Sequence, residues 1–435
     1  MSGERGWRAI YNGLMLPLAY AGVRAAAPFH GKLRATVEGR DGVEERWRAA
    51  AGRLKAKPVW FHVASVGEYE QARPLITRLK ESHPDIAVAI SVTSPSGYTY
   101  IKRKETFDER NNVKFVDYMP FDFEDNVRFC LASLDPRLLV FVKFDLWPNL
   151  IWGAAEEKVP VVLIDGTLSE TSKRFTAFGR RFYSSVYPAI DKILAISEDD
   201  ALRFRRCAPA HPSVTVAGDT RFDRVMERKK NKTGGRPAIA GSDRLTVMAG
   251  STWPRDEEHL LGPLARLARD EPGVLLVIAP HEPSPERIAE LLSWARSESL
   301  EAVRLSELSP AAPAAKTVRL ALVDSVGALA ELYEHCDVAY VGGSFSTGVH
   351  NVIEPAIMGI PVLFGPIHKN SFEALELLRA GAASEVAGAA DVERVLGSLV
   401  RDGAKRKEMG ERARRFVESQ LGATERCYEA IREYL

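Results

Sequence analysis

Glu68 is the residue of this sequence whose type and position best suit acid–base catalysis. It follows the apolar run Val59-Trp-Phe-His-Val63, where a strand is expected to pass into a helix. A carboxylate at the carboxyl edge of a parallel sheet can take the proton of an acceptor hydroxyl as that hydroxyl attacks an anomeric carbon. Ser65 and Glu68 also have the spacing of a capping box, in which Glu68 would only cap the helix. Both roles remain open.

A glycine-rich turn in the second half of the chain is suited to binding a phosphate. The segment Val341-Gly-Gly-Ser-Phe-Ser-Thr-Gly-Val-His-Asn-Val-Ile-Glu354 supplies glycines for close backbone approach, and a helix expected to begin near Asn351 would offer free N–H groups. Gly343 and Gly348 have P-loop spacing, but Val349-His350 replaces the Lys-Ser/Thr pair, which disfavours a Walker ATPase. No GxGxxG follows the first strand of either half, which disfavours hydride transfer.

Glu354 has two possible roles in this turn. With Asn351 it matches a helix cap and its capping-box partner. At the end of a strand it could instead accept hydrogen bonds from the vicinal hydroxyls of a ribose. Three further strand-to-helix turns accompany it, at residues 249–254, 279–282 and 324–329. Several turns of this kind together indicate a nucleotide site.

The elements that must position these residues alternate between strand and helix. The expected strands of the first half are residues 59–63, 86–92, 138–142, 161–164, 193–196 and 214–216. Those of the second half are residues 245–249, 274–278, 320–323, 338–341 and 361–364. Continuous apolar strands separated by helices are typical of parallel sheets covered on both faces. The sequence therefore predicts two doubly wound α/β domains, with one cleft at the carboxyl ends of both sheets.

The bulk composition excludes several classes of function. The 435 residues carry 59 Lys plus Arg against 58 Asp plus Glu, so no global charge favours nucleic acid. Four scattered cysteines without a CxxC argue against a zinc site or a disulfide framework. Asp122-Phe-Glu-Asp125 loosely resembles the DxD pair of metal-dependent transferases, but its composition predicts the solvated start of a helix.

The N-terminal segment allows two interpretations. Gly13-Leu-Met-Leu-Pro-Leu-Ala-Tyr-Ala-Gly-Val23 is apolar and flanked by Arg5, Arg8 and Arg24, but it is shorter than the ~20 residues that a membrane-spanning helix requires. It has no clear A-x-A cleavage signature. It is either a helix packed on the domain or an interfacial anchor, to which Lys32 and Arg34 would add attraction for anionic lipid.

A series of short motifs resembles that of the Kdo (3-deoxy-D-manno-octulosonic acid) transferases, in order and spacing, over about residues 58 to 380. The motifs are His62-Val-Ala-Ser-Val-Gly-Glu68, Asp145-Leu-Trp-Pro-Asn149, Gly218-Asp-Thr-Arg-Phe-Asp223, Ala249-Gly-Ser-Thr252, Val341-Gly-Gly-Ser344, His350-Asn-Val-Ile-Glu-Pro355 and Phe364-Gly-Pro366.

The resemblance implies a GT-B fold and transfer of Kdo from CMP-Kdo to a lipid A precursor of the lipid IVA type, with inversion and without metal or other cofactor. It places the reaction in lipopolysaccharide core synthesis, on the anionic cytoplasmic face of a bacterial inner membrane, with no role for nucleic acid. The implied organisation is a membrane-associating segment (1–28), an acceptor domain (29–226), a linker (227–244), a donor domain (245–404) and a C-terminal helix that crosses back (405–435).

The resemblance also implies roles for individual residues. Glu68 would be the proton acceptor, with Ser65 and Gly67 on the acceptor side, and Arg221 would stabilise charge on the departing phosphate. The residues implied in binding CMP are Ser251, Thr252, Pro280, His281, Val326, Gly327, Ala328, Gly343, Ser344, His350, Asn351, Val352, Ile353 and Glu354.

Three positions depart from the family pattern. Lys143-Phe-Asp145 stands where the family commonly has Glu-Thr-Glu, the Arg of a Pro-Arg-His motif is missing before His281, and Val349 replaces a glycine. Asp145 could position the acceptor or only satisfy the turn before Trp147, and Lys143 could pair with the Kdo carboxylate or an acceptor phosphate. A GT-B transferase that uses a UDP-sugar and an inactive nucleotide-sugar-binding homologue remain the alternatives.

Overall fold

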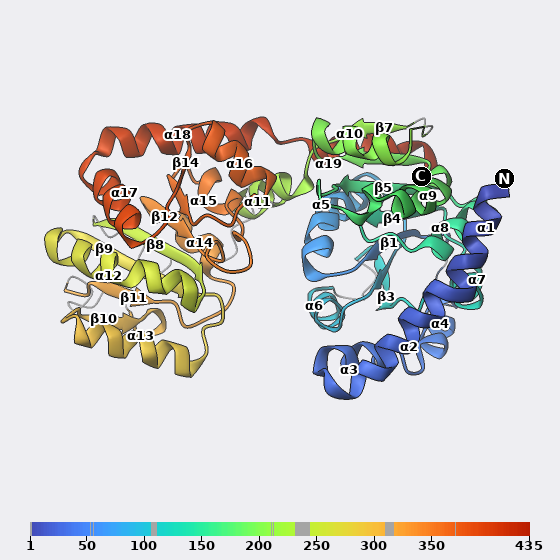
Figure 1. Cartoon of the computed structure of the whole chain (residues 1–435), viewed down its shortest axis with the longest axis horizontal. Coiled ribbons are helices and arrows are strands. Elements are labelled where there is room, and N and C mark those ends of the chain that lie inside the picture. The colour runs from blue at the N-terminus through green and yellow to red at the C-terminus, as the bar shows by residue number, and fades with distance from the viewer. Residues whose placement is uncertain are drawn as a thin grey trace. The chain divides into compact units, whose positions relative to one another are not determined.

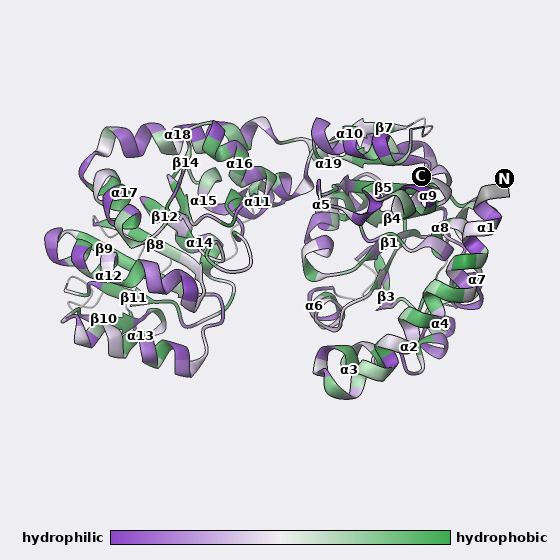
Figure 2. Ribbon diagram, viewed as in Figure 1, coloured by the Kyte–Doolittle hydropathy of each residue, from purple (hydrophilic) through white to green (hydrophobic). Residues whose placement is uncertain are grey.

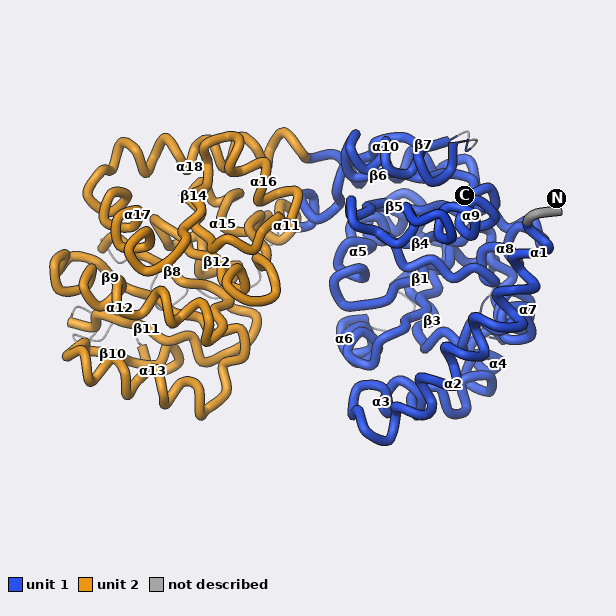
Figure 3. Tube along the Cα trace, viewed as in Figure 1, with its two compact units in different colours: residues 1–224, 421–435 blue, residues 225–420 orange. Residues whose placement is uncertain are grey.

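The computed structural model describes residues 2–52, 54, 56–105, 111–209, 211, 213–230, 244–308, 317–369 and 371–435. The chain divides into two compact units, residues 1–224 with 421–435 and residues 225–420 (Figure 3). Most of the predicted linker, residues 231–243, lies outside the described residues. Each unit is built on one parallel sheet.

The first unit contains a seven-stranded parallel sheet in the order β3-β2-β1-β4-β5-β6-β7 (Figure 1). The strands are β1 (Val59–Val63), β2 (Val88–Val92), β3 (Val113–Tyr118), β4 (Leu138–Val142), β5 (Val161–Gly166), β6 (Lys192–Ala195) and β7 (Val214–Val216). The sequence analysis missed β3, in which Lys114 and Asp117 interrupt the apolar run. The chain adds strands on one side of β1 and then crosses to β4 on the other side. The topological switch point therefore lies between β1 and β4.

Helices surround this sheet. They are α1 (Ser2–Ile10), the π-helical η1 (Tyr11–Met15), α2 (Leu16–Ala26), η2 (Ala27–Phe29), α3 (Gly31–Glu38), α4 (Val43–Ala51), α5 (Val66–Ser82), α6 (Pro95–Lys104), α7 (Glu124–Leu134), α8 (Pro148–Glu156), η3 (Lys173–Phe175), α9 (Ala177–Val186), η4 (Tyr187–Ala189), α10 (Glu198–Cys207), α19 (Ala423–Ile431) and η7 (Arg432–Tyr434). β1, β4 and β5 are buried along their whole length, as expected of central strands covered on both faces.

The second unit repeats this architecture with the strand order β10-β11-β9-β8-β12-β13-β14. Its strands are β8 (Leu245–Thr252), β9 (Val274–Pro280), β10 (Ala302–Arg304), β11 (Leu320–Leu322), β12 (Val338–Val341), β13 (Val362–Phe364) and β14 (Ala383–Glu385). Its helices are α12 (Pro254–Asp270), α13 (Pro285–Ser297), η5 (Leu305–Glu307), α14 (Leu329–Tyr333), α15 (Ile353–Ile357), α16 (Phe372–Arg379), α17 (Ala389–Arg401) and α18 (Gly403–Ser419). The sequence analysis missed the edge strands β10 and β14, because three residues are too few to show a pattern. The switch point of this sheet lies between β8 and β12.

The chain passes between the units twice. The helix α11 (Thr220–Lys230) contains the first unit boundary, and the second follows α18. Asp223 of α11 links this helix to the segment after α18, because its carboxylate accepts hydrogen bonds from the backbone N–H of Gly422 (2.7 Å) and Thr424 (2.6 Å). Residues 421–435 belong to the first unit, where Cys427, Tyr428 and Ile431 enter the core. The prediction of two doubly wound α/β domains is confirmed.

The N-terminal helices have one packed face and one exposed face. Trp7, Tyr11 and Met15 pack against the core of the first unit. Ile10, Leu14 and Leu18, by contrast, are 42%, 56% and 64% exposed. Figure 2 shows hydrophobic residues along the N-terminal helices α1 and α2. None of the described helices is both long and apolar enough to cross a membrane.

Candidate functional site

Glu68 lies at the N-terminus of α5, beside the switch point of the first sheet. Ser65 is the N-cap residue of α5, and its Oγ accepts a hydrogen bond from the backbone N–H of Glu68 at 3.4 Å. The Glu68 carboxylate accepts a hydrogen bond from the backbone N–H of Ala64. Ser65 and Glu68 therefore do cap α5. Glu68 is also only 6% exposed, and capping does not account for this burial. The exposed Gly67 occupies the same first turn.

The environment of Glu68 suits a proton acceptor. Burial raises the pKa of Glu68 to about 7, against the lowering effect of the Ala64 N–H. The negative charge of Asp145 raises this pKa further, and the positive charge of Lys143 lowers it. Asp145 and Lys143 therefore both lie within electrostatic reach of Glu68. A carboxyl group with a pKa near neutrality can accept a proton and release it again at physiological pH.

Lys143 and Asp145 occupy the turn after β4, on the other side of the switch point. Lys143 has a left-handed backbone (φ 71°) and its N–H donates to Ile164 O at 2.9 Å. Burial raises the pKa of Asp145, and a 3.4 Å hydrogen bond from the Trp147 indole partly opposes this. The structure thus brings Glu68, Lys143 and Asp145 together, as the parallel topology requires. Asp145 also satisfies the turn before Pro148, so neither of its predicted roles is excluded.

His62 is a polar residue of this region to which the sequence analysis gave no role. Its Nδ1 is 2.8 Å from Ser91 Oγ, and its ring centroid is 5.0 Å from that of Trp147. Its Nε2 is buried and has no hydrogen-bond partner in the described part of the chain. Burial lowers the pKa of His62 to about 3, so the imidazole is neutral and is a poor proton acceptor.

Arg221 lies at the start of α11 and is bound to a buried carboxylate of its own unit. Its Nε is 2.9 Å and its Nη2 2.6 Å from Asp219 Oδ2. Asp165 holds the neighbouring Thr220 through its backbone N–H (2.8 Å) and its hydroxyl (2.6 Å). A phosphate contact from Arg221 would have to share the guanidinium with Asp219, so this prediction is not yet supported by geometry.

The prediction of a solvated face at residues 122–125 is wrong for Asp122. Asp122 is 5% exposed, and its carboxylate accepts hydrogen bonds from the backbone N–H of Asn149 (3.0 Å) and Leu150 (3.1 Å). It therefore caps α8 from a different part of the chain, and burial raises its pKa to about 7. Asp125 is solvated, as expected, with 95% of its side chain exposed.

In the second unit, the glycine-rich turn is folded around a buried carboxylate. Asp256 is 0% exposed. Its Oδ2 accepts hydrogen bonds from the backbone N–H of Trp253 (2.9 Å) and Gly343 (2.8 Å). Its Oδ1 accepts from Tyr340 Oη–H (2.9 Å) and the Phe345 N–H (3.3 Å). Two backbone N–H groups of the turn that was predicted to bind a phosphate are thus used inside the protein.

Ser344 and Thr252 serve the same internal network. Ser344 is fully buried, and its Oγ accepts the backbone N–H of Gly365 at 2.6 Å. Thr252 is 2% exposed and donates its hydroxyl proton to Glu257 Oε1 at 2.7 Å. Ser251 has a left-handed backbone (φ 53°), and its carbonyl leaves no room for a Cβ at Gly342. The hydroxyls of Ser344 and Thr252 are therefore not available for the contacts with CMP that were predicted for them.

Three rings form a stack where β8, β9 and β12 end. His281, directly after Pro280, stacks on Trp253 with ring centroids 4.6 Å apart and on His350 with centroids 4.4 Å apart. The rings of His281 and His350 are nearly parallel, at 8°. The predicted donor residues His281 and His350 therefore meet next to the switch point of this sheet, where ligands bind in doubly wound folds. Trp253 lies in the predicted turn at residues 249–254, but the sequence indicated no role for its side chain.

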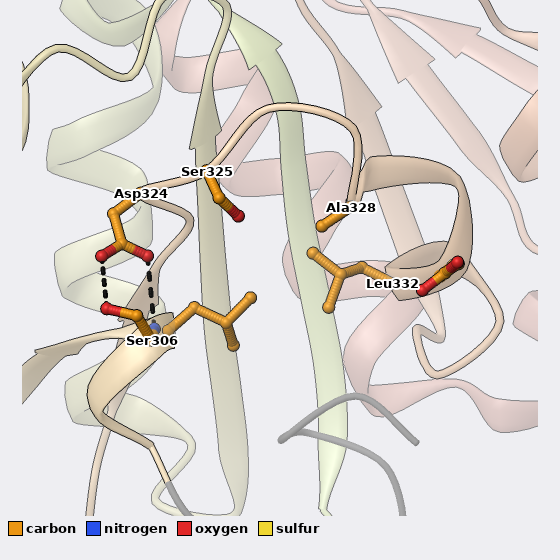
Figure 4. Close-up of a pocket in the computed structure, with 7 residues that line it drawn as sticks. Ser306, Asp324, Ser325, Ala328 and Leu332 are labelled. Carbon is orange, nitrogen blue, oxygen red and sulfur yellow. Dashed lines mark hydrogen bonds between the residues drawn. The ribbon is translucent and has the colours of Figure 1, made fainter. Parts of the chain in front are cut away.

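The loop before α14 lines a cavity of about 200 Å³ (Figure 4). Asp324 and Ser306 form its polar side, where Asp324 accepts a hydrogen bond from the Ser306 backbone N–H at 3.2 Å. Ala328 and Leu332 form its apolar side. Val326, between Asp324 and Ala328 in the chain, is 88% exposed, and Gly327 has a φ of 99°. A flat ring with one polar edge would fit such a cavity.

Comparisons with known proteins show what the chain is similar to. Residues 41–224 match the family model described as 3-deoxy-D-manno-octulosonic-acid transferase (kdotransferase). A 3-deoxy-D-manno-octulosonic acid transferase of Chlamydia muridarum is 28% identical over 94% of this chain and 94% of its own length. That of Bordetella pertussis is also 28% identical, over 87% of this chain and 88% of its own length. This chain is therefore similar to Kdo transferases over most of its length.

Solved structures show the same fold. A Staphylococcus aureus MnaA–UDP structure has a TM-score of 0.58 and 15% identity, over 87% of this chain and 97% of that one. MurG of Acinetobacter baumannii has a TM-score of 0.55 and 13% identity, over 87% of this chain and 100% of that one. This Kdo transferase homologue thus has a GT-B fold, with two Rossmann-like domains.

Glu354 is held differently from the expected capping box. The helix α15 begins at Ile353, with Val352 at its N-cap and no side-chain cap, whereas the Asn351 side chain accepts the Ile353 N–H at 3.0 Å. Glu354 Oε1 instead accepts a hydrogen bond from Arg228 Nη1 at 3.2 Å. Val352 and Ile353 are fully buried, so only their backbone could touch a ligand.

We expect Glu354→Ala to weaken CMP binding by about 1–3 kcal/mol if the carboxylate holds the ribose, because hydrogen bonds to charged groups fall in that range. Calorimetric titration with CMP measures the effect. The matched control is Arg228→Met, which removes the ion-pair partner of Glu354 and should change CMP affinity little. Equal losses in both variants, or a lower melting temperature with unchanged affinity, would assign Glu354 a structural role only.

Proposed function

We propose that this protein transfers Kdo from CMP-Kdo to a lipid A precursor, with inversion at the Kdo anomeric carbon and without a metal ion. The observation that carries this proposal is the buried Glu68, raised in pKa to about 7, at the switch point of a unit that matches the Kdo transferase family model. The similarity extends into the second unit, where the ring stack and the cavity before α14 offer places for a nucleotide.

In the proposed reaction Glu68 is the general base. The acceptor hydroxyl oxygen forms a bond to the anomeric carbon, and its proton passes to the Glu68 carboxylate. The bond from that carbon to the phosphate oxygen breaks, and its electron pair leaves with CMP. Lys143 offers a positive charge near Glu68 that would pair with the Kdo carboxylate or an acceptor phosphate. Asp145 would stabilise the oxocarbenium-like centre or position the acceptor.

For the donor, we propose that the cytosine ring lies against Ala328 in the cavity before α14 and that Glu354 binds the ribose hydroxyls. The cavity has a polar side at Asp324 and an apolar side at Leu332, which suits an aromatic ring with polar substituents on one edge. The phosphate would then lie towards His350 and His281. Titration of the protein with CMP and with UDP tests this arrangement, and tighter binding of UDP would contradict it.

The reaction itself is tested by mass spectrometry of the product made from CMP-Kdo and a tetraacylated lipid A precursor. We expect the acceptor mass to increase by one or more Kdo residues in a buffer that contains a metal chelator. No mass increase with CMP-Kdo, while CMP binds, would favour a nucleotide-sugar-binding protein without catalysis. Transfer from a UDP-sugar only would replace the proposed donor.

We further propose that the exposed face of the N-terminal helices lies on the cytoplasmic face of a bacterial inner membrane. Ile10, Leu14 and Leu18 recur every four residues, so they form one continuous apolar strip. The exposed side chains of Arg5, Arg24, Lys32 and Arg34 surround this region and would attract anionic lipid. Arg8, predicted to belong to this flank, instead binds Glu124 at 2.7 Å and Glu156.

Leu14→Ser combined with Leu18→Ser should weaken binding to anionic vesicles by about tenfold or more, because each leucine buried in a membrane contributes about 1.5–3 kcal/mol. The melting temperature should hardly change, since both side chains are exposed in the folded protein. Vesicle flotation measures the binding. Leu202→Ser is the matched control, because Leu202 is 54% exposed on α10. Unchanged flotation of the double variant would exclude this strip as the membrane contact.

A further inference from the structure

The hydrogen bond between Trp253 and His350 determines which nitrogen of the imidazole carries a proton. Trp253 Nε1 is 2.9 Å from His350 Nε2. An indole N–H can only donate a hydrogen bond, so His350 Nε2 must accept and must be unprotonated. The single proton of the neutral ring is then on Nδ1. A second proton on Nε2 would place two N–H groups against each other.

Two other contacts and one close backbone approach fix the position of His350. Its backbone N–H donates to Gly342 O at 3.0 Å, and its ring is stacked on His281. On the side of Nε2, a Cβ at Gly343 would lie 2.8 Å from His350 Cδ2. Gly343 also has a φ of 87°. Only glycine therefore fits there, for both its conformation and its close approach to the ring.

The charges around His350 also favour the neutral imidazole. Burial lowers the pKa of His350, and the neighbouring His281 on the β9 side lowers it further. Asp256 on α12 acts in the opposite direction, but its carboxylate is already engaged by Trp253, Gly343, Phe345 and Tyr340. In the described part of the chain no hydrogen-bond acceptor is recorded for Nδ1 of His350.

We propose that Trp253 is a positioning residue that holds His350 as a neutral imidazole and leaves its Nδ1–H to donate a hydrogen bond to the phosphate of the bound nucleotide. This inference rests on the proposed donor site. Because the donor N–H is present in the neutral ring, its contribution to nucleotide binding is independent of pH. A fixed N–H also avoids the cost of reorienting the ring when the ligand arrives.

The tautomer is tested directly by ¹⁵N nuclear magnetic resonance of the full chain with labelled histidine, with the His350 signals assigned by comparison with His350→Gln. In the unaltered protein we expect an unprotonated Nε2 and a protonated Nδ1 between about pH 6 and about pH 8. In Trp253→Phe, which keeps a ring against His281 but lacks the N–H, both tautomers and the doubly protonated form should become populated. A protonated Nε2 in the unaltered protein would overturn the proposal, whether or not the variant folds.

The consequence for binding is measured with the methyl ester of CMP, whose phosphate carries one charge across this range, whereas the second ionisation of CMP itself falls near pH 6. Four proteins are compared: the unaltered chain, Trp253→Phe, His350→Gln and the double variant. Subtracting each His350→Gln measurement removes the contribution of His281. The pH dependence that then remains in the affinity for the ester should be close to zero when Trp253 is present. Without Trp253, the ester should bind about fivefold more tightly at low pH than at high pH, because charged donors bind more strongly than neutral ones.

The possible failures are distinguishable. If the CMP ester does not bind to the unaltered protein, the proposed donor site fails, and the ligand role of His350 fails with it. If the ester binds but His350→Gln and Trp253→Phe leave its affinity unchanged at every pH, the donor site stands and the role proposed for Trp253 and His350 is wrong.

Discussion

Replacing Glu68 by glutamine should lower kcat by about 10²–10⁴-fold without loss of folded stability, because general-base catalysis contributes this much and an amide cannot accept the proton. The glutamine keeps the shape and can still accept the hydrogen bond from the Ala64 N–H, so the cap on α5 is largely retained. Steady-state kinetics with CMP-Kdo and the lipid acceptor measure the loss, and CMP affinity should be unchanged.

The stability of the same variant has a predictable sign. The pKa of Glu68 in the folded protein, about 7, is above its ordinary value of 4.5, so its contribution to stability is complete below pH 4.5 and is lost as the pH rises through 7. At about pH 8 the buried charge costs on the order of 3 kcal/mol, which glutamine avoids. The melting temperature of Glu68→Gln should therefore equal or exceed that of the unaltered protein at this pH. A merely structural cap predicts the opposite.

The pH dependence of kcat/KM gives a third test of the same residue. The unaltered enzyme should lose activity as the pH falls below about 7, because protonated Glu68 cannot act as a base. The residual activity of Glu68→Gln should lack this acidic limb. Glu81→Gln, an exposed position near the end of α5, is the matched control and should behave as unaltered protein. Activity of Glu68→Gln within about threefold of normal would show that Glu68 is only a cap.

Replacing Asp256 by asparagine should destabilise the second unit by about 3 kcal/mol or more, because one of the two oxygens becomes an NH₂ group that faces donors. Each oxygen now accepts two hydrogen bonds, from Trp253 and Gly343 at Oδ2 and from Tyr340 and Phe345 at Oδ1. Either orientation of the amide therefore loses two of them. Chemical denaturation measures the stability.

The same variant should also lose CMP affinity, because Asp256 holds both Trp253 and the turn that carries His350. Calorimetric titration with CMP at a temperature where the variant is folded separates this effect from unfolding. Asp270→Asn, an exposed position at the end of α12, provides the matched control. If Asp256→Asn retains normal stability and normal CMP affinity, the network around this carboxylate does not organise the site.

The fold and the neighbourhood of the site could be predicted from the sequence because both depend on local pattern. Long apolar strands such as Leu138–Val142 predict a buried parallel sheet by themselves, and parallel strands carry the residues that follow them to one edge. Glu68 and Lys143-Phe-Asp145 could therefore be predicted at the same edge without knowledge of any contact. The short strands β10 and β14 could not be found in this way, since their three residues pair only because a neighbouring strand is present.

Only the tertiary structure decided what each polar group in these turns does. The sequence predicted a phosphate at the glycine-rich turn, but the N–H groups of Gly343 and Phe345 in this turn donate to Asp256, almost 90 residues away in the chain. It left Glu354 either as a cap or as a ligand of a ribose, and only the structure shows that Arg228 is its ion-pair partner. Hydrogen-bond donors and acceptors are satisfied by whichever group lies within about 3 Å, and that distance bears no relation to separation along the chain. For the same reason the tautomer of His350 could not be read from the sequence, because it is set by Trp253 at the end of another strand.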